Sequence, residues 1–235
     1  MDMENIDKED ILIKERYKNR EHNSQYSILK PEIFKMHQER LWHEMTMLSS
    51  HFGSKDFSNL NLTDMGSGYG FNILEFLRMG FMPSNISAIE LIKDRFDISK
   101  KIIPNDVNLY NLNAINAPIA NISQDIVFQS AVFTSILDEK YKQTLAKNMW
   151  NWIKPGGCIL YYDFIFNNPK NKEVKGVSIK EIKELFPDGN LKYKKKLTLA
   201  MPISRKVCSI HPSVYNLFNI FPFLRTHVLC LIEKR

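Results

Sequence analysis

Three glycines stand within five residues in segment 64–70, which reads DMGSGYG and follows a short apolar run. Glycines at this spacing let the backbone turn tightly and approach a ligand at the amino terminus of the next helix. The dinucleotide pattern G-x-G-x-x-G is absent, because Phe71 stands at its third glycine position, and the phosphate-loop pattern is absent too. The remaining acid-x-G-x-G-x-G pattern predicts a ligand without a phosphate chain but with a cationic amino-acid end.

Polar residues also stand at the ends of the next apolar runs. Glu90 ends the run 85–90, Asn113 follows 107–112, Gln129 ends 125–129 and Asp163 ends 158–163. Open α/β sheets bind ligands outside the carboxyl ends of their strands. We therefore expect the candidate site at this edge of a sheet.

Hydrophobic periodicity predicts the elements that position these residues. Strands alternating with helices indicate a parallel sheet covered by helices on both faces. Residues 1–30, which precede the first predicted helix, are polar and charged. The predicted strands are 61–65, 85–90, 107–112, 125–129, 158–163, 191–199 and 224–232. The predicted helices are 31–52, 71–79, one ending near 103, 138–152 and 178–185, with a turn at 154–157 and only a short helical piece, near 213–219, between the last two strands.

Composition limits the class of protein. The chain has 235 residues, 44% hydrophobic and 25% charged, and a net charge of +6, which fits one globular unit and excludes a largely disordered chain. It has no secretory signal and no apolar stretch of about 20 residues, so we expect a cytoplasmic protein without a membrane span. Three cysteines without a C-x-x-C pattern suit a reducing compartment and argue against structural zinc. The basic run 192–196 (KYKKK) is interpreted as a solvated edge strand.

Segment 62–70 resembles motif I of the class I S-adenosylmethionine-dependent methyltransferases. In that family an acid at the position of Glu90 binds the ribose hydroxyls, and an Asp or Asn at the position of Asn113 recognises the adenine amino group. Segment 152–157 (WIKPGG) resembles the family's turn into strand five. The resemblance implies an α/β fold, with a Rossmann-like seven-stranded, mostly parallel sheet, helices on both faces and an antiparallel last strand. It implies S-adenosylmethionine as cofactor and S-adenosylhomocysteine as product.

The resemblance also implies a cofactor-binding set. For Asp64 two roles stay open, since it can bond the backbone of the loop or contact the cofactor. Residues 1–52 are expected to form an arm and a helix that cover the cofactor site, and 53–235 the methyltransferase core. The implied cofactor-binding residues are Asp64, Gly66, Ser67, Gly68, Gly70, Glu90, Leu91, Asn113, Ala114 and Gln129, with Tyr17 and Arg20 from the arm.

Topology suggests residues that contact the acceptor of the methyl group. If strand 191–199 is parallel to the others, residues 200–227 overhang the pocket, and 200–223 form a substrate lid. Arginine there can hold a phosphate or carboxylate, and histidine can act as a base near neutral pH. The candidates are Tyr162, Arg205 and Arg225 for acceptor binding, and Asp163, His211 and His227 for catalysis. Each histidine can instead be structural, and Asp163 can instead be a cap.

Missing motifs narrow the acceptor. No Asn/Asp-Pro-Pro-aromatic motif follows strand 125–129, which disfavours nucleic acid, and the metal-binding carboxylates of catechol-type enzymes are absent, so no metal is expected. Segments 162–169, 182–187 and 221–227 are similar to methyltransferases of bacterial surface-polysaccharide (capsule or lipopolysaccharide) biosynthesis. We therefore expect O-methylation of a small anionic, phosphorylated or sugar-linked acceptor. The alternatives are an RNA methyltransferase and a catalytically inactive, cofactor-binding partner subunit; the oligomeric state stays open.

Overall fold

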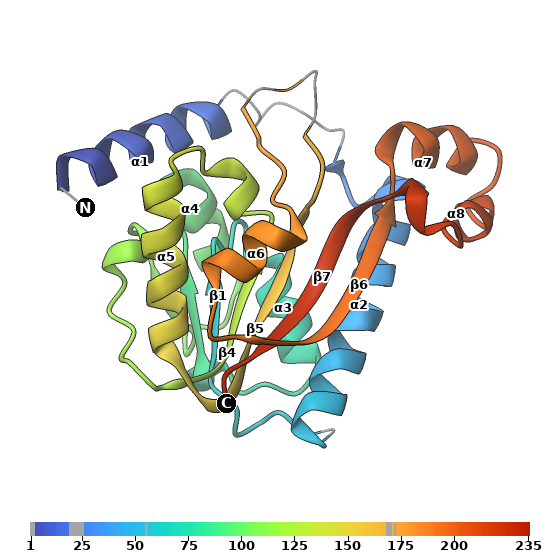
Figure 1. The fold of residues 1–235 in the computed structure, drawn as a ribbon. Coiled ribbons are helices and arrows are strands. Elements are labelled where there is room, and N and C mark those ends of the chain that lie inside the picture. Colours follow the sequence, from blue (N-terminus) through green and yellow to red (C-terminus); the bar gives the residue numbers. More distant parts are fainter. Residues whose placement is uncertain (1–2, 19–25, 55, 168–170, 172) are drawn as a thin grey trace.

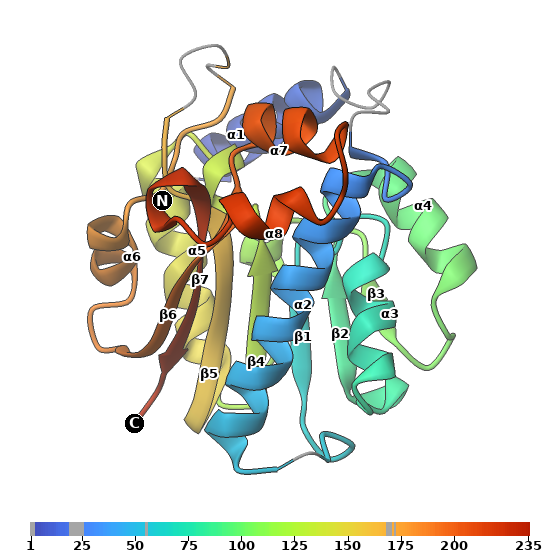
Figure 2. The same ribbon diagram turned by 90° about the vertical axis from the view of Figure 1, so that its right-hand side faces the viewer.

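A seven-stranded sheet forms the centre of the molecule. The structure is a computed structural model and describes residues 3–18, 26–54, 56–167, 171 and 173–235. The strand order is β3-β2-β1-β4-β5-β7-β6, with helices on both faces (Figures 1 and 2). The strands are β1 (Leu62–Met65), β2 (Ile86–Ile89), β3 (Asn108–Tyr110), β4 (Gln124–Ser130), β5 (Ile153–Phe164), β6 (Asn190–Leu199) and β7 (Arg225–Glu233).

Two buried clusters, one on each face, hold the helices to the sheet. In β5, Ile159 and Tyr161 belong to one cluster, whereas Leu160 and Tyr162 belong to the other, as the two-residue period of a strand requires. The α-helices are α1 (Met3–Lys18), α2 (Pro31–Phe52), α3 (Phe71–Arg78), α4 (Lys93–Ile102), α5 (Glu139–Trp152), α6 (Ile179–Leu185), α7 (Met201–Cys208) and α8 (Val214–Phe218). Helices α1, α5 and α6 pack on the first cluster, and α2 and α3 pack on the second.

The directions of the strands confirm the predicted fold. Strands β1 to β5 pair in parallel, β7 is antiparallel to β5, and β6 is antiparallel to β7. Strand β6 therefore runs in the same direction as β1 to β5, and its carboxyl end lies at the same edge as theirs. Strand β6 is also the last strand of the sheet, so the basic run 192–196 lies on an edge strand as expected.

Two local predictions were wrong, and one helix was not predicted. Residues 3–18 form the helix α1, whose buried positions Glu9, Asp10, Ile13 and Arg16 are mostly charged and so hide the helical period from an apolar pattern. The segment between β6 and β7 contains a second helix, α7, whose buried side is made of small residues. The predicted turn 154–157 lies inside β5, where the backbone stays paired while the register with β4 shifts.

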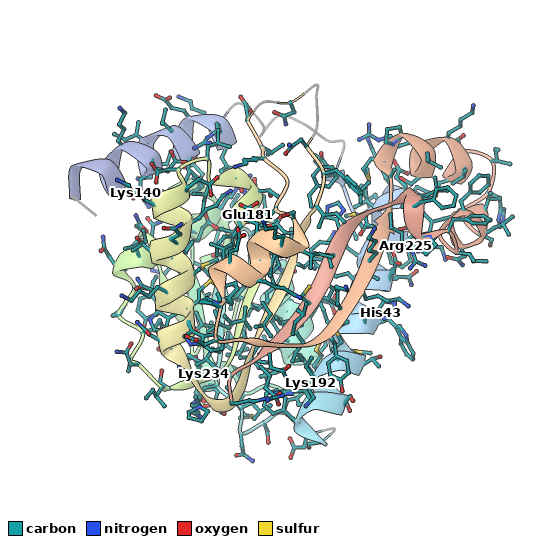
Figure 3. All side chains as sticks on the ribbon, viewed as in Figure 1. His43, Lys140, Glu181, Lys192, Arg225 and Lys234 are labelled. Atoms are coloured by element: carbon teal, nitrogen blue, oxygen red, sulfur yellow. The ribbon has the colours of Figure 1, made fainter. Side chains whose placement is uncertain are left out.

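Residues 201–224, here called the α7–α8 module, project beyond the carboxyl end of β6 (Figure 1). Glu39 of α2 holds this module: it accepts hydrogen bonds from the Tyr215 hydroxyl (3.1 Å), the Asn219 amide (2.7 Å) and the Thr198 backbone N–H (3.0 Å). Arg225 lies at the root of the module (Figure 3) and donates to the carbonyl oxygens of Asn219 and Lys196. No helix in the described part of the chain combines the length and apolar character needed to cross a bilayer.

Candidate active site

The glycine-rich loop joins β1 to α3 and has the backbone angles that glycine permits. Gly66, Gly68 and Gly70 have φ of 74°, 58° and 85°. A Cβ on Gly66 would lie 2.5 Å from Val132 Cγ2, and one on Gly70 would collide with Ile103. A Cβ on Gly68 would meet nothing within 4 Å. The outer two glycines therefore allow close packing, and the middle one leaves an open surface at the amino terminus of α3.

Glu90 connects this loop to the end of β2. One carboxylate oxygen accepts from the Gly68 N–H and the other from the Ile92 N–H, both at 2.7 Å. Burial raises the pKa of Glu90, and these two bonds oppose that rise. A carboxylate offers about four lone-pair directions, so Glu90 keeps the capacity to accept from ribose hydroxyls as well.

Asp64 lies below the loop, fully buried in β1, and neither carboxyl oxygen has a hydrogen-bond partner. Burial raises its pKa to about 8, although the positive charge of Arg40 opposes the rise. Of the two roles that the sequence left open, bonding to the loop backbone is not present among the described contacts. A buried, unpartnered carboxyl beside an open loop is suited to a cationic ligand group.

Asn113, expected to recognise adenine, contacts the helix α1. Its amide nitrogen donates to both carboxylate oxygens of Asp10 (2.8 and 2.7 Å), and its amide oxygen accepts from the Ile115 N–H. Asp10 also accepts from the Tyr141 hydroxyl at 2.7 Å. Asp10 was not among the residues predicted from the sequence, because no packed helix was expected in residues 1–30. Leu91 and Ala114 are half-buried in the adjoining cluster.

Tyr17 at the end of α1 brings the arm to the glycine-rich loop. Its hydroxyl lies 3.0 Å from the Ser135 hydroxyl, and the Arg95 guanidinium lies 4.3 Å from the centre of its ring. The same guanidinium lies 5.2 Å from the ring of Tyr69 in the loop. These contacts place Tyr17 beside the loop, and its role toward the cofactor stays a prediction, whereas Arg20 lies outside the described residues.

Gln129 and Ser67 are buried where strands end. The Gln129 amide donates to the Tyr162 carbonyl (3.2 Å) and accepts from the Val132 N–H (3.1 Å). The Ser67 N–H donates to the Ile89 carbonyl at 3.0 Å. In the described structure the Gln129 side chain therefore links β4 to β5 by a hydrogen bond, and its role toward a ligand stays a prediction.

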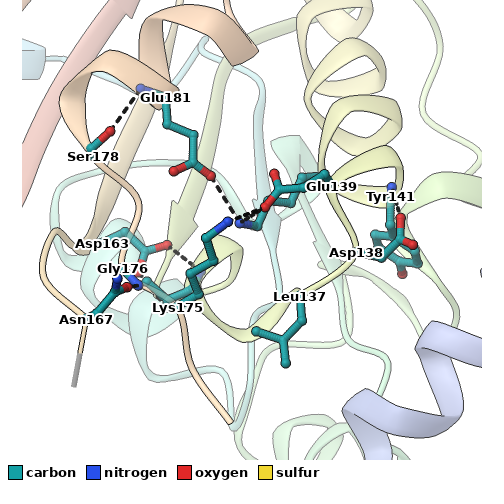
Figure 4. Close-up of polar contacts among 12 residues, drawn as sticks. Leu137, Asp138, Glu139, Tyr141, Asp163, Asn167, Lys175, Gly176, Ser178 and Glu181 are labelled. Atoms are coloured by element: carbon teal, nitrogen blue, oxygen red, sulfur yellow. Dashed lines mark hydrogen bonds and ion pairs between the residues drawn. The ribbon is translucent and has the colours of Figure 1, made fainter. Parts of the chain in front are cut away.

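Asp163 at the end of β5 accepts hydrogen bonds from nearby residues of the protein (Figure 4). One carboxylate oxygen accepts from the Thr134 hydroxyl (2.7 Å) and the Phe164 N–H (2.9 Å), and the other from the Thr134 N–H (3.3 Å). Burial raises its pKa to about 6 despite these bonds. These contacts match the capping role that the sequence left as an alternative to catalysis.

Ion pairs next to Asp163 fix the chain between β5 and α6 (Figure 4). The fully buried Lys142 ammonium lies 3.1 Å from Glu181 and 3.5 Å from Glu139, and Lys175 pairs with Glu139. A buried ammonium requires such partners. This side of the site is therefore anchored on α5.

Arg40, Tyr162 and His227 form a group on the α2 side of the same edge. The Tyr162 and His227 rings are stacked with centres 5.1 Å apart, and the Arg40 guanidinium lies 5.3 Å from the Tyr162 ring. Arg40 also donates to Ser130 at the end of β4 (2.8 Å) and to Asn72 in α3 (2.6 Å). Burial and the Arg40 charge lower the pKa of His227 to about 3, so its imidazole is neutral near neutral pH.

Arg40 was not among the residues predicted from the sequence, although the sequence carries a signal for it. Arg40 follows Ile33 by seven residues and precedes Met47 by seven, which places all three on the buried side of α2. A charged residue on an apolar helix face is rarely buried without a specific partner. Arg40 was therefore recognisable as a candidate from its position alone.

The remaining predicted residues lie on or beside the α7–α8 module and are not gathered around Tyr162. His211 is exposed, and its ring nitrogen accepts from the Ser213 N–H at 3.2 Å, as in a capped turn. Arg225 is bonded to backbone carbonyls, and Arg205 is exposed on α7. Their roles in catalysis and acceptor binding stay predictions.

Comparison with known proteins agrees with this geometry. Residues 63–161 match a family model described as a methyltransferase domain. No curated protein matches the chain.

Several solved structures share the fold. Geranyl diphosphate C-methyltransferase from Streptomyces coelicolor A3(2), solved with Mg²⁺, geranyl diphosphate and S-adenosylhomocysteine, is 15% identical, with 82% of this chain and 77% of that chain covered and a TM-score of 0.61. A putative sarcosine dimethylglycine methyltransferase from Galdieria sulphuraria is 13% identical, covering 83% and 85%, with a TM-score of 0.61. A Haloferax volcanii complex of the Trm112 methyltransferase activator and a putative methyltransferase is 13% identical, covering 83% and 90%, with a TM-score of 0.60. At these identities the likeness concerns the fold.

Residues 63–161 are thus a methyltransferase domain, built on a mostly parallel sheet with the glycine-rich loop at its edge. The sequence resemblance implies S-adenosylmethionine as the cofactor. The residues present fit that group: the open surface at Gly68 admits it, and the unpartnered Asp64 carboxyl suits a cation. When bound, the cofactor supplies an electrophilic methyl group on a sulfonium.

Proposed function

We propose that the enzyme methylates an oxygen atom of a small anionic acceptor, phosphorylated or sugar-linked, in surface-polysaccharide biosynthesis. The observation that carries this proposal is the Arg40–Tyr162–His227 group at the carboxyl ends of β4 and β5. This group lies at the edge where the glycine-rich loop also lies. An acceptor placed there would approach the cofactor from the α2 side.

Local charge supports an anionic acceptor. Arg40 is buried and has two carboxyl groups nearby, Glu44 at 3.2 Å and Asp64. Burial raises the pKa of both, that of Asp64 to about 8, so near neutral pH the Asp64 carboxyl is largely protonated and does not neutralise Arg40. A guanidinium in a poorly hydrated site binds phosphate or carboxylate strongly.

The neutral His227 ring supports an oxygen nucleophile. Its low pKa makes it a weak proton acceptor, but a neutral imidazole can accept a hydrogen bond from a hydroxyl and orient it. Alignment of nucleophile, methyl group and sulfur can provide roughly 7–11 kcal/mol, which exceeds the contribution of a general base. His227 is thus the strongest of the three catalytic candidates, ahead of the capped Asp163 and the exposed His211.

The pathway and the cell compartment rest on sequence alone. Segments 162–169, 182–187 and 221–227 are similar to enzymes of surface-polysaccharide biosynthesis. We assign the enzyme to the cytoplasm and propose that residues 1–52 cover the cofactor and 200–223 cover the acceptor. Helix α1 and the α7–α8 module lie at the carboxyl edge of the sheet, whereas α2 runs along its face (Figure 2); the position of α1 and of the module supports this division.

A methyl-transfer assay tests the proposal. Radiolabelled S-adenosylmethionine is combined with sugar phosphates, nucleotide sugars and the matching uncharged sugars, and transfer is expected to the charged acceptors. Arg40→Gln should raise KM for the acceptor by about ten- to a hundredfold, because it removes a charge-assisted contact worth roughly 1.5–3 kcal/mol. Arg78→Gln, which alters an exposed arginine paired with Glu75, is the matched control and should leave KM unchanged.

His227→Gln separates orientation from binding. It should lower kcat more than it raises KM, because the amide keeps a hydrogen-bond acceptor but changes its direction. Methylation of uncharged sugars in preference to charged ones would contradict the anionic acceptor. Transfer to nitrogen or carbon would contradict an oxygen nucleophile.

RNA is the second candidate acceptor. The exposed Lys194 and Lys195 on the edge strand β6 favour it. RNA methylation would show binding that weakens steeply with salt. Lys194→Glu/Lys195→Glu would then abolish RNA methylation, and a small acceptor would be unaffected by the same variant.

A further inference from the structure

The outer side of the α7–α8 module carries a concentration of exposed apolar side chains. Six occur within residues 210–223, and the exposed fraction reaches 75% for Ile210 and 76% for Phe223. Single exposed apolar residues are ordinary, but a group confined to one short segment indicates a binding surface. These six side chains, here called the apolar tip, are Ile210, Leu217, Phe218, Ile220, Phe221 and Phe223.

The module has an inner side that already supplies its packing. Tyr215, Val207 and Cys208 are buried with Leu199 in a small cluster of their own. Within α8, Tyr215 is 1% exposed and Leu217 is 60% exposed. The tip therefore does not hold the module to the body, and the module itself projects beyond the sheet (Figure 1).

The charged residues in the segment that carries the tip are all basic. No Asp or Glu occurs between Asp188 and Glu233, a stretch that contains seven Lys and Arg residues. Arg205 and Lys206 are exposed on α7. The acids of α2 beside the module are turned inward: Glu32 is buried, and Glu39 accepts three hydrogen bonds from the module and β6.

We propose that the apolar tip docks on an anionic lipid surface. Aromatic and aliphatic side chains enter the boundary between headgroups and acyl chains, and flanking Lys and Arg interact with anionic headgroups. A second copy of the chain is a poorer partner, because a two-fold contact would bring the same basic residues face to face. The module follows β6 at the carboxyl edge, so docking would turn the candidate active site toward the lipid.

Vesicle binding by the full-length protein, without cofactor or acceptor, tests this proposal and does not depend on the proposed function. Vesicles of phosphatidylcholine with an equal amount of phosphatidylglycerol are compared with pure phosphatidylcholine in a flotation assay. The tip variant is Leu217→Ser/Ile220→Ser/Phe223→Ser. The matched control is Met82→Ser/Ile122→Ser, which alters two exposed apolar residues next to the amino ends of β2 and β4. Circular dichroism checks that each variant is folded.

The wild type is expected to float with the anionic vesicles and not with the neutral ones. The tip variant should reduce the partition coefficient on the order of a hundredfold, and Lys206→Glu roughly tenfold, with the control unchanged. Absence of wild-type binding, or equal loss in the control, would overturn the proposal. So would a wild-type dimer in sedimentation velocity that the tip variant converts to a monomer, since the tip would then bind a second copy.

Discussion

Among the residues expected to bind the cofactor, Asp64 has the carboxyl group that a bound cation would affect most. The carboxyl group is buried, lacks a partner and has a pKa of about 8. A sulfonium or ammonium ion bound beside it would favour the ionised form and lower that pKa. We therefore expect binding of a cationic ligand near neutral pH to release a proton from Asp64.

We predict that the affinity for S-adenosylmethionine rises with pH. Between about pH 6 and pH 8 the association constant should increase by up to about tenfold per unit, and it should level off above the free-protein pKa. Calorimetric titration across this range measures it. The ligand's own amino group also titrates, so Asp64→Asn serves as the reference that shows the ligand's contribution alone. Identical pH profiles for the two proteins would contradict a role for Asp64 in binding the cation.

The same pKa predicts how stability changes with pH. The folded protein keeps the Asp64 proton to about pH 8, whereas the unfolded chain loses it near pH 3.8. Unfolding therefore releases a proton in this interval, and the free energy of unfolding falls as pH rises, by at most about 1.4 kcal/mol per unit. Urea unfolding of the wild type and of Asp64→Asn measures the free energy of unfolding of each protein. The difference between the two proteins should grow as the pH rises from about 4 to about 8. A constant difference would mean that Asp64 is ionised in the folded protein.

At the scale of elements, prediction succeeded where the sequence pattern and the packing use the same residues. The helix α2 was expected at 31–52 and has those bounds, because its proline start and apolar spacing are both local signals. The glycine-rich loop was recognisable because its backbone angles demand glycine at three close positions. The helix α1 was missed, since it packs through charged residues whose partners, Asn113 and Leu137, are more than a hundred residues away. Such pairings are invisible to a local pattern, and so was the role of Asp10, whereas the helical position of Arg40 did carry a local signal.

Glu39 determines how firmly the α7–α8 module is held. Replacing it with Ala leaves the Tyr215, Asn219 and Thr198 donors without their acceptor, and all three residues are buried. We expect Glu39→Ala to cost about 2–4 kcal/mol, because each orphaned donor costs roughly 1–3 kcal/mol and the losses are not additive. Hydrogen exchange should then accelerate in residues 199–224 before the rest of the molecule.

The neighbouring exposed residue provides the control for this element. Gln38→Ala should leave exchange in the module unchanged, because Gln38 lies on the solvent side of α2. Glu39→Gln keeps one oxygen acceptor and should be intermediate. Uniform acceleration across the whole sheet in Glu39→Ala would show that the module and the body unfold together.

The helix α1 is expected to retain the cofactor. It is held at the site by two contacts. Asp10 accepts a hydrogen bond from Asn113, and the ring of Tyr17 packs against the Arg95 guanidinium. Removal of residues 1–18 should raise the dissociation rate of S-adenosylhomocysteine by about tenfold or more, since a covering element mainly slows release. Stopped-flow competition measures that rate. Tighter binding by the truncated protein would show instead that Asp10 competes with the ligand for Asn113.

At the scale of the whole molecule, three separate parts of the chain meet at one edge of the sheet. Helix α1, the glycine-rich loop and the α7–α8 module are far apart in sequence, yet all lie at the carboxyl ends of the strands (Figures 1 and 2). The unfolded chain offers no such site. Ligand binding must therefore stabilise the folded state as a whole.

We predict that S-adenosylhomocysteine at about a hundred times its dissociation constant adds about 2.7 kcal/mol to the free energy of unfolding. For a chain of this size that corresponds to a rise in melting temperature of about 5–11 °C. Glu90→Gln should show a much smaller rise at the same ligand concentration, because a neutral amide binds ribose hydroxyls less strongly than a carboxylate. Hydrogen exchange with ligand present should slow in α1 and in residues 64–70, but not in residues 153–157 at the opposite edge. Slower exchange at both edges would mean that the ligand acts through global stability, and no change in α1 would show that this helix does not cover the cofactor.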